Sequence, residues 1–368
     1  MIRVLHVLGG LNLGGAETMV MNLYRAIDRT QIQFDFIIHL QGKQAYEEEV
    51  LSSGGKIYRF PAFTGKNILE ERKLWKQFFS EHKGYKILHS HVRSYAAIYL
   101  PIAKKNGLTT IIHSHSTSNG KGITSIAKYI MQLPLRYQAD YLFACSDIAG
   151  KWLFGKNVDK KSNYRVFPNA INTQRFNYDR AKRLEVRKML NITNKFVVGH
   201  VGRMTASKNH MFLINIFEQI AKDREDAVLL LVGDGELRDS IKSYIISKDI
   251  NNKVIMIGNK NNIQDYYQAM DVFVFPSLWE GLGIVVIEAQ TTGLPCFVAE
   301  SIPEEANLDD KLFYKLKLCE GEKNWAKAIE NMGDNVDRVG RVENACEKGF
   351  DICENALQLE KLYLTMEK

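Results

Sequence analysis

Two carboxylates lie eight positions apart in the segment 276–288, on either side of a glycine-rich turn. Glu280 lies in the turn, and Glu288 lies in the apolar run after it, which is predicted to be a helix. Helices rise about 1.5 Å per residue, so the carboxylates could stand on the order of 10 Å apart, roughly the span from a transferable sugar to a ribose. Gly281 and Gly283 let the backbone approach a ligand closely. The pattern therefore suits a sugar nucleotide, because the alternative of two solvated charges fits poorly with the apolar neighbours of Glu288.

Two cations stand five positions apart in a loop that follows another predicted strand. The loop starts at Gly202 and carries Arg203 and Lys208 where a diphosphate would lie against the next helix. Transfer of a sugar from a nucleotide leaves negative charge on the departing diphosphate, and a forked guanidinium with an ammonium can stabilise it. The sequence holds no Asp-x-Asp pair, so no metal is expected to share this work. The alternative is that both cations are ordinary surface charges.

Two more glycine loops follow predicted strands. Gly14 and Gly15 open a predicted helix at 16–27, where backbone N–H groups and the helix dipole could hold a phosphate or a sugar oxygen. They lack the strict Gly-x-Gly-x-x-Gly spacing, so a tight turn without a ligand is an equal alternative. The loop with Gly233 leads into a predicted helix at 237–247, and we expect its backbone to shape a nucleotide pocket. Its alternative role is a simple turn with Glu236 at the helix start.

Four histidines end two predicted strands of the first half: His89 and His91, then His113 and His115. Histidine pairs without cysteines or a carboxylate cluster are poor evidence for a metal site, so none is predicted. Residues two apart in a strand share a face. Each pair therefore points either towards a ligand or into the packing of the sheet.

Short apolar runs alternate with helical patterns along the whole chain, which predicts parallel sheets covered by helices. The predicted strands are 2–8, 34–40, 56–60, 86–91, 109–114, 141–146, 165–167, 196–202, 228–232, 253–258, 272–275 and 295–299. A polar, charged stretch at 169–194 separates two series. We predict an acceptor-side domain at 1–170, a nucleotide-sugar domain at 171–349 and a terminal helix at 350–368. Ligands of such sheets bind beyond the carboxyl ends of strands, where the motifs lie.

Length, net charge and cysteine content limit the kinds of protein that this chain could be. A chain of 368 residues fits two domains, and the first strand is too short for a signal peptide or membrane span, so a cytoplasmic protein is expected. The net charge of +7 permits attraction to phosphates or to an anionic membrane, while no basic stripe with aromatics predicts nucleic-acid binding. Five scattered cysteines fit reduced thiols: Cys145, Cys296, Cys319, Cys346 and Cys353.

The motif of two glutamates separated by seven residues, here Glu280 and Glu288, is similar to that of the retaining glycosyltransferases of family four (group 1). Within this family the chain most resembles the bacterial capsule and exopolysaccharide branch. The resemblance runs from Gly14-Gly15-Ala16-Glu17 to Pro303-Glu304-Glu305. It implies the GT-B fold, an α/β fold with two doubly wound Rossmann-like domains facing across a cleft, and a terminal helix that crosses back to the first domain. It also implies a nucleotide-sugar donor and no metal requirement.

The resemblance implies roles for the residues that match the family's motifs. Arg203 and Lys208 bind the diphosphate, Gly14 and Gly15 face the diphosphate and the acceptor, and one histidine lies beside the sugar. We favour His115 over His113, because it lies further beyond the apolar run. Glu280 positions the sugar and Glu288 accepts ribose hydroxyls. The remaining expected contacts are the backbone of Gly202, Gly233, Leu282, Gly283 and Ile284, and Asn259 near the base.

One motif differs from the sequence that is usual in the family. Residues 168–172 read Pro-Asn-Ala-Ile-Asn where the family often has Pro-Asn-Gly-Ile-Asp, which could alter the hinge. The segment 121–137 mixes basic and apolar residues, so it is either a basic helix at a membrane interface or a buried helix interrupted near Pro134.

The predicted function is transfer of a hexosyl or N-acetylhexosaminyl unit, with retention, from a UDP-sugar or other nucleotide sugar. The expected acceptor is a lipid-linked saccharide or oligosaccharide in bacterial surface polysaccharide synthesis, with contact to the inner face of the membrane. A sugar-nucleotide 2-epimerase of the same architecture and a non-catalytic nucleotide-sugar-binding subunit are the alternatives. The sequence does not name the sugar, the acceptor or the linkage.

Overall fold

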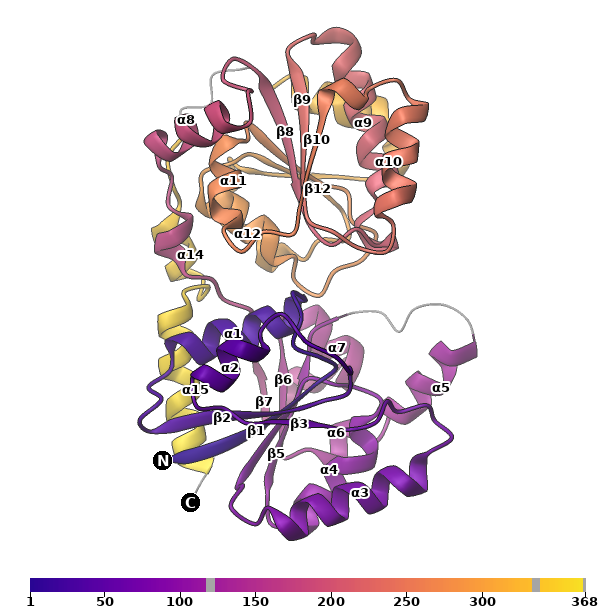
Figure 1. The fold of residues 1–368 in the computed structure, drawn as a ribbon, viewed down its shortest axis with the longest axis vertical. Coiled ribbons are helices and arrows are strands. Elements are labelled where there is room, and N and C mark those ends of the chain that lie inside the picture. The colour runs from indigo at the N-terminus through magenta and orange to yellow at the C-terminus, as the bar shows by residue number, and fades with distance from the viewer. Residues whose placement is uncertain (117–122, 333–337, 367–368) are drawn as a thin grey trace. The chain divides into compact units, whose positions relative to one another are not determined.

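The chain folds into two compact units in the computed structural model, which describes residues 1–116, 123–332 and 338–366. One unit contains Met1–Ile171 and Asp351–Lys368, and the other contains Asn172–Phe350. The boundaries inferred from the sequence lie one residue from these divisions. Each unit is a parallel sheet with helices on both faces (Figure 1). This is the predicted α/β fold with two doubly wound Rossmann-like domains.

The first unit has a seven-stranded sheet in the order β3-β2-β1-β4-β5-β6-β7. Its central strands are almost fully buried and rich in isoleucine, valine, leucine and phenylalanine, as is typical of parallel strands covered on both faces. The strands are β1 Ile2–Leu8, β2 Ile32–Ile38, β3 Ile57–Arg59, β4 Ile87–Ser90, β5 Thr109–Ser114, β6 Tyr141–Ala144 and β7 Tyr164–Val166.

Two apolar clusters fill the two faces of this sheet. The terminal helix α15 (Ile352–Met366) packs beside α1 (Gly15–Ala26) on one face, and buries Leu359 and Tyr363 there (Figure 1). The end of the chain therefore completes the core of the first unit. The other helical segments of this unit are α2 Glu47–Ser52, α3 Ile68–Glu81, α4 Ala96–Lys105, α5 Ile123–Gln132, α6 Leu135–Gln138, α7 Asp147–Phe154 and η1 Val158–Lys160.

The second unit has a six-stranded sheet in the order β10-β9-β8-β11-β12-β13. Its strands are β8 Phe196–Val201, β9 Ala227–Val232, β10 Val254–Gly258, β11 Val272–Phe275, β12 Cys296–Ala299 and β13 Phe313–Leu316. The helices are α8 Arg180–Met189, α9 His210–Asp223, α10 Arg238–Ser247, α11 Ile263–Ala269, α12 Ile284–Thr291, α13 Glu322–Glu330 and α14 Val342–Glu347. Short 3-10 turns are η2 Thr173–Phe176, η3 Ala206–Lys208, η4 Asn251–Lys253, η5 Glu304–Ala306 and η6 Leu318–Glu320.

The segment 121–137 forms two helices, because α5 ends at Gln132 and α6 begins after Pro134. Its first two residues lie outside the described part of the chain. Ile126 is 61 %, Tyr129 55 % and Ile130 60 % exposed, so the buried-helix interpretation is wrong for this part of α5, whereas Leu135 of α6 is fully buried. No helix in the parts of the chain that the structure describes is long and apolar enough to span a membrane.

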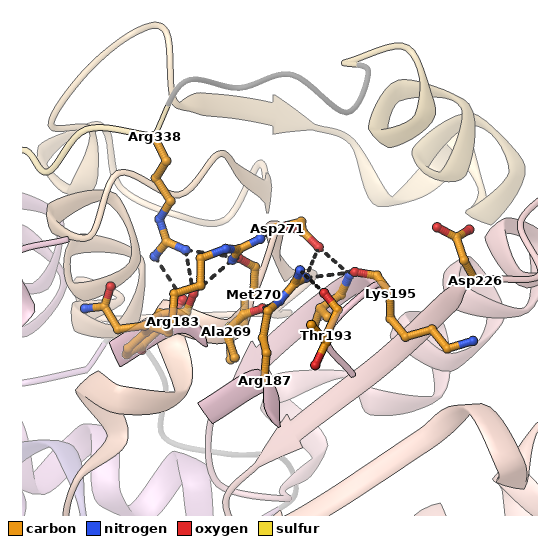
Figure 2. A network of polar contacts seen from close by, with 12 residues as sticks. Arg183, Arg187, Thr193, Lys195, Asp226, Ala269, Met270, Asp271 and Arg338 are labelled. Atoms are coloured by element: carbon orange, nitrogen blue, oxygen red, sulfur yellow. Dashed lines mark hydrogen bonds and ion pairs between the residues drawn. The ribbon is translucent and has the colours of Figure 1, made fainter. Parts of the chain in front are cut away.

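Three arginines of the second unit converge on the carboxyl end of α11 and on Asp271 (Figure 2). Arg183 and Arg187 both pair with the Asp271 carboxylate, which also accepts from the backbone N–H of Val197 at 2.7 Å. Among the described residues, Arg338 donates to backbone oxygens and to one threonine hydroxyl, and burial lowers its pKa to about 9. Cations suit the negative end of a helix dipole. Asp271 thus organises the surrounding backbone, beside a hollow of about 520 Å³ at the amino ends of β8, β11 and β12.

Candidate functional site

Loops at the carboxyl ends of β8, β9 and β10 meet through their backbones. Gly233 donates to the carbonyl of Gly258 at 2.9 Å, and Gly202 donates to that of Val232 at 3.0 Å. The φ angle of Gly233 is +134°, and a Cβ there would lie 2.1 Å from the carbonyl oxygen of Gly202. Glycine is therefore needed at position 233, because the φ angle is positive and the backbone of Gly202 lies too close for a Cβ. Asn259 follows Gly258 directly and is exposed, so three predicted positions share one edge of the sheet.

Lys208 and Glu280 form an ion pair, with Nζ and Oε1 2.5 Å apart and side chains only 17 % and 14 % exposed. Lys208 ends η3, after β8, whereas Glu280 follows β11. The Ser277 hydroxyl lies 2.6 Å from the same carboxylate oxygen, and the ammonium lies 4.7 Å from the ring centroid of Phe275. Glu280 is thus not a solvated loop charge. The pair places a cation and an acceptor side by side at the edge where ligands of such sheets bind.

Helix α12 begins beside this pair, with Gly283 as its N-cap in the left-handed region at φ +83°. Leu282 is buried at 3 % exposure, and Ile284 is the first helical residue. The first N–H groups of a helix have no partner within it. The backbone from Leu282 to Ile284 therefore leads into the start of a helix, and donor binding by this backbone stays a prediction.

Glu288 lies inside α12 and is only 7 % exposed. Its Oε2 accepts from the Tyr267 hydroxyl at 2.7 Å. Burial raises the pKa of Glu288 to about 7, and the hydrogen bond from Tyr267 opposes that rise. The solvated-face interpretation is wrong, because the carboxyl group is held in a nearly dry setting.

Arg203 does not share the carboxylate partner of Lys208. Its side chain is 67 % exposed, and its closest charged neighbour is Glu236, with 3.9 Å between the nitrogen and oxygen atoms. A guanidinium with this much freedom can swing towards a diphosphate, whereas Lys208 is already held. The two predicted cations therefore differ in how far they are preorganised.

In the loop after β1, Gly9 and Gly15 have open space around them, whereas a Cβ at Gly14 would lie 2.3 Å from Oε2 of Glu17. Helix α1 starts at Gly15, and Gly14 is its N-cap with an extended φ of −102°. Neither Gly9 nor Gly15 would bring a Cβ within 4 Å of another atom of the described chain. Backbone strain therefore explains none of these glycines, and the loop offers bare backbone at the carboxyl end of β1.

The histidines of the first unit stack across its central strands. His113 is fully buried, and its Nε2 lies 3.2 Å from the carbonyl oxygen of Phe167. His115, which follows β5, is only partly buried. The Nδ1 of His89 contacts the Tyr363 hydroxyl at 2.6 Å.

A histidine that sequence reasoning missed links this stack. Nδ1 of His6 lies 3.0 Å from Nε2 of His91, and Nδ1 of His91 lies 2.9 Å from Nε2 of His115. Nitrogens of His6, His89 and His91, and of His91, His113 and His115, lie within 4.8 Å of one another, close enough to ligate a metal. Neither group includes a carboxylate, and His91 uses both nitrogens in bonds to other rings. His6 lies within an apolar strand, and only the pairing of β1 with β4 could have revealed it.

Ser277 and Tyr267 were also missed. Ser277 precedes Glu280 by three residues, a spacing at which turns often bring side chains together. Tyr267 lies in α11, 21 residues before Glu288, and no local pattern signals their contact.

Comparison with known proteins agrees with this geometry. The family model Glycosyltransferase Family 4 matches residues 13–175, and Glycosyl transferases group 1 matches residues 182–335. The glycosyltransferase EpsF of Bacillus subtilis (strain 168) is 32 % identical over 98 % of this chain and 96 % of its own. An Escherichia coli protein named UDP-Gal:alpha-D-GlcNAc-diphosphoundecaprenol alpha-1,3-galactosyltransferase is 25 % identical over 82 % of this chain and 79 % of its own.

Solved structures share the fold of the whole chain. Anabaena HepE in complex with UDP has a TM-score of 0.72 and 16 % identity, covering 100 % of this chain and 97 % of its own. A glycosyltransferase from Rickettsia africae has a TM-score of 0.78 and 18 % identity, covering 100 % and 99 %. The architecture is therefore GT-B, and the chain belongs to the group 1 glycosyltransferases of family four.

Proposed function

We propose that this protein is a retaining glycosyltransferase that moves a hexosyl or N-acetylhexosaminyl unit from a UDP-sugar to a lipid-linked saccharide or oligosaccharide. The observation that carries the proposal is the Lys208–Glu280 pair beside the amino end of α12, with Glu288 within that helix. Relatives support the setting: the E. coli protein is named for a diphosphoundecaprenol-linked acceptor, and HepE was solved with UDP. Bacterial surface polysaccharide synthesis is the expected process.

In this mechanism the bond from the anomeric carbon to the diphosphate breaks, and its electron pair stays on the phosphate oxygen. Lys208 and Arg203 stabilise that charge, without a metal ion. Glu280 and the backbone from Leu282 to Ile284 hold the sugar, and Glu288 accepts ribose hydroxyls. The acceptor oxygen bonds to the anomeric carbon on the same face, and its proton passes to the departing phosphate.

Purified protein with a panel of nucleotide sugars, with and without lipid-linked acceptors, tests this proposal. Acceptor-dependent release of nucleoside diphosphate and a product with the donor's anomeric configuration are expected. An epimerised nucleotide sugar formed without acceptor would identify the 2-epimerase. Tight donor binding with no product would identify a non-catalytic subunit.

We also propose that α5 contacts the anionic inner face of the cell membrane. Ile126 and Ile130 are about 60 % exposed next to the exposed Lys128, a combination that suits an interface with acidic headgroups. Ile126→Ser with Ile130→Ser should reduce co-sedimentation with anionic vesicles several-fold. The control Ile246→Ser, at an exposed position of α10, should not. Equal binding to neutral vesicles, or no binding by the unaltered chain, would contradict the proposal.

A further inference from the structure

Three histidines form one hydrogen-bonded chain through the sheet of the first unit. His6 lies in β1 and is fully buried, His91 follows β4 and is 8 % exposed, and His115 follows β5 at the outer end. The links are His6 Nδ1 to His91 Nε2 at 3.0 Å and His91 Nδ1 to His115 Nε2 at 2.9 Å. The end nitrogens, Nε2 of His6 and Nδ1 of His115, are buried and have no hydrogen-bond partner among the described residues.

The surroundings of all three rings favour the uncharged imidazole. Burial lowers the pKa of His6 and of His115 to about 3, and it lowers that of His91 well below the ordinary value. The neighbouring rings lower the pKa of His91 further, and Arg93 lowers that of His115. A neutral imidazole carries one N–H donor and one bare acceptor nitrogen.

This chemistry allows only two states in which both links exist. If His6 carries its proton on Nδ1, it donates to His91, which must then donate through its own Nδ1 to Nε2 of His115. His115 in turn carries its proton on Nδ1. In the opposite state every ring is protonated on Nε2. If the rings differ in the protonated nitrogen, at least one of the two hydrogen bonds is lost. The outer nitrogen of His115 is thus coupled to the inner nitrogen of His6.

The surroundings of the two ends favour the first state. The ring of His6 lies 4.1 Å from that of Phe34 and 5.7 Å from that of Phe36, centroid to centroid. An orphaned N–H in such a setting is less tolerable than a bare acceptor nitrogen. At the outer end, the Asn169 side chain lies close enough to raise the pKa of His115, and its Oδ1 is buried without a partner. An N–H on His115 suits that oxygen.

We propose that His6 and His91 are positioning residues that fix His115 with its proton on Nδ1, so that it offers a hydrogen-bond donor at its outer end. Resting on the proposed function, this lets the Nδ1–H of His115 donate to a sugar or phosphate oxygen that takes the place of the Asn169 oxygen. It is then not the base that removes the acceptor's proton, because its lone pair is occupied by His91.

Nuclear magnetic resonance of the ligand-free chain with 15N-labelled histidine tests this directly. Long-range 1H–15N correlations distinguish the two ring nitrogens, and a spectrum of His115→Asn assigns the signals. We expect a protonated Nδ1 and a bare Nε2 on His115. A bare Nδ1 on His115 would overturn the proposal, whether or not the chain transfers sugar.

Two substitutions of His91 separate tautomer control from packing. His91→Asn keeps an amide donor near the position of Nδ1, whereas His91→Phe keeps the stacked ring and removes the donor. In the His91→Phe variant, His115 should shift towards the Nε2–H form. This variant should lose about tenfold more turnover than His91→Asn, as a wrong tautomer does. It should nevertheless melt at a higher temperature than His91→Asn. A packing role predicts the reverse order of turnover, which would overturn the proposal.

His113→Phe is the matched control. The ring of His113 lies 4.1 Å from that of His115 but makes no hydrogen bond to it among the described contacts. The nitrogen shifts of His115 should therefore stay in place. A shift as large as that in His91→Phe would show that packing alone sets the tautomer, and would refute the role of the chain.

Discussion

Replacing Glu288 by glutamine should make the second unit more stable at pH 8 and weaken its binding of UDP. Burial raises the pKa of Glu288 from 4.5 to about 7. The folded chain then holds this proton more tightly than the unfolded chain, so the free energy of unfolding falls as the pH rises from 4.5 to about 7. Above that range the penalty is constant. Glutamine mimics the protonated side chain and keeps an oxygen for the Tyr267 hydroxyl.

The magnitude follows from the same interval. At about 1.36 kcal/mol per pH unit, the unfolding free energy lost between the two pKa values amounts to about 3 kcal/mol. In a domain of this size 1 kcal/mol moves the melting temperature by about 2–4 °C, so Glu288→Gln should melt on the order of 5–10 °C above the unaltered chain at pH 8. The gain should be small at pH 5. Glu225→Gln, at an exposed position of the same unit, should show no such dependence.

The loss of UDP binding supplies the second readout. Ribose hydroxyls donate to an ionised carboxylate, and charge-assisted hydrogen bonds of this kind are worth about 1.5–3 kcal/mol, or tenfold and more in Kd. Calorimetry at pH 8 should show that weakening, while the unaltered chain should lose affinity as the pH falls below about 7. Equal melting temperatures at pH 8 would refute the buried charge, and an unchanged Kd would refute the ribose contact.

The other predictions concern the cations, the sugar-side groups and metal. Lys208→Ala and Arg203→Ala should each lower turnover by a factor on the order of 10². Only Lys208→Ala should lower the melting temperature, since it removes the ammonium that pairs with the Glu280 carboxylate. Equal melting temperatures would contradict this. Glu280→Ala should spare UDP binding in calorimetry and damage transfer. His115→Ala should fold normally and lose most turnover, whereas His113→Ala should mainly lower the melting temperature, and the reverse would move the sugar contact to His113. EDTA should leave the rate nearly unchanged, and rescue by manganese after its loss would disprove the metal-independent mechanism.

The fold was predictable wherever strands are buried on both faces. Strands β1, β5 and β11 begin and end at the residues predicted for them. The sequence missed β13, because Phe313–Leu316 is an edge strand with exposed Tyr314 and Lys315, and a short run with two polar-facing residues resembles a loop. In the segment 121–137, Pro134 carried the signal of the interruption between α5 and α6.

The site was predictable as a set of residues but not as a set of contacts. Spacing within one segment identified Glu280 and Glu288, since turn and helix geometry are local. The partners of those carboxylates, Lys208 and Tyr267, come from elements 72 and 21 residues away. Local patterns do not encode such pairings, and nor do they reveal that Glu288 titrates near neutrality.

The strand order explains why the unpredicted contacts fall where they do. In the first sheet the order reverses between β1 and β4, and His6 in β1 bonds His91 after β4. In the second it reverses between β8 and β11, and Lys208 after β8 pairs with Glu280 after β11. At such a switch point the connections leave in opposite directions, so side chains from the two neighbouring strands meet at an edge that no crossover covers. Both contacts therefore follow from topology, and a reader who had the strand order as well as the sequence could have derived them.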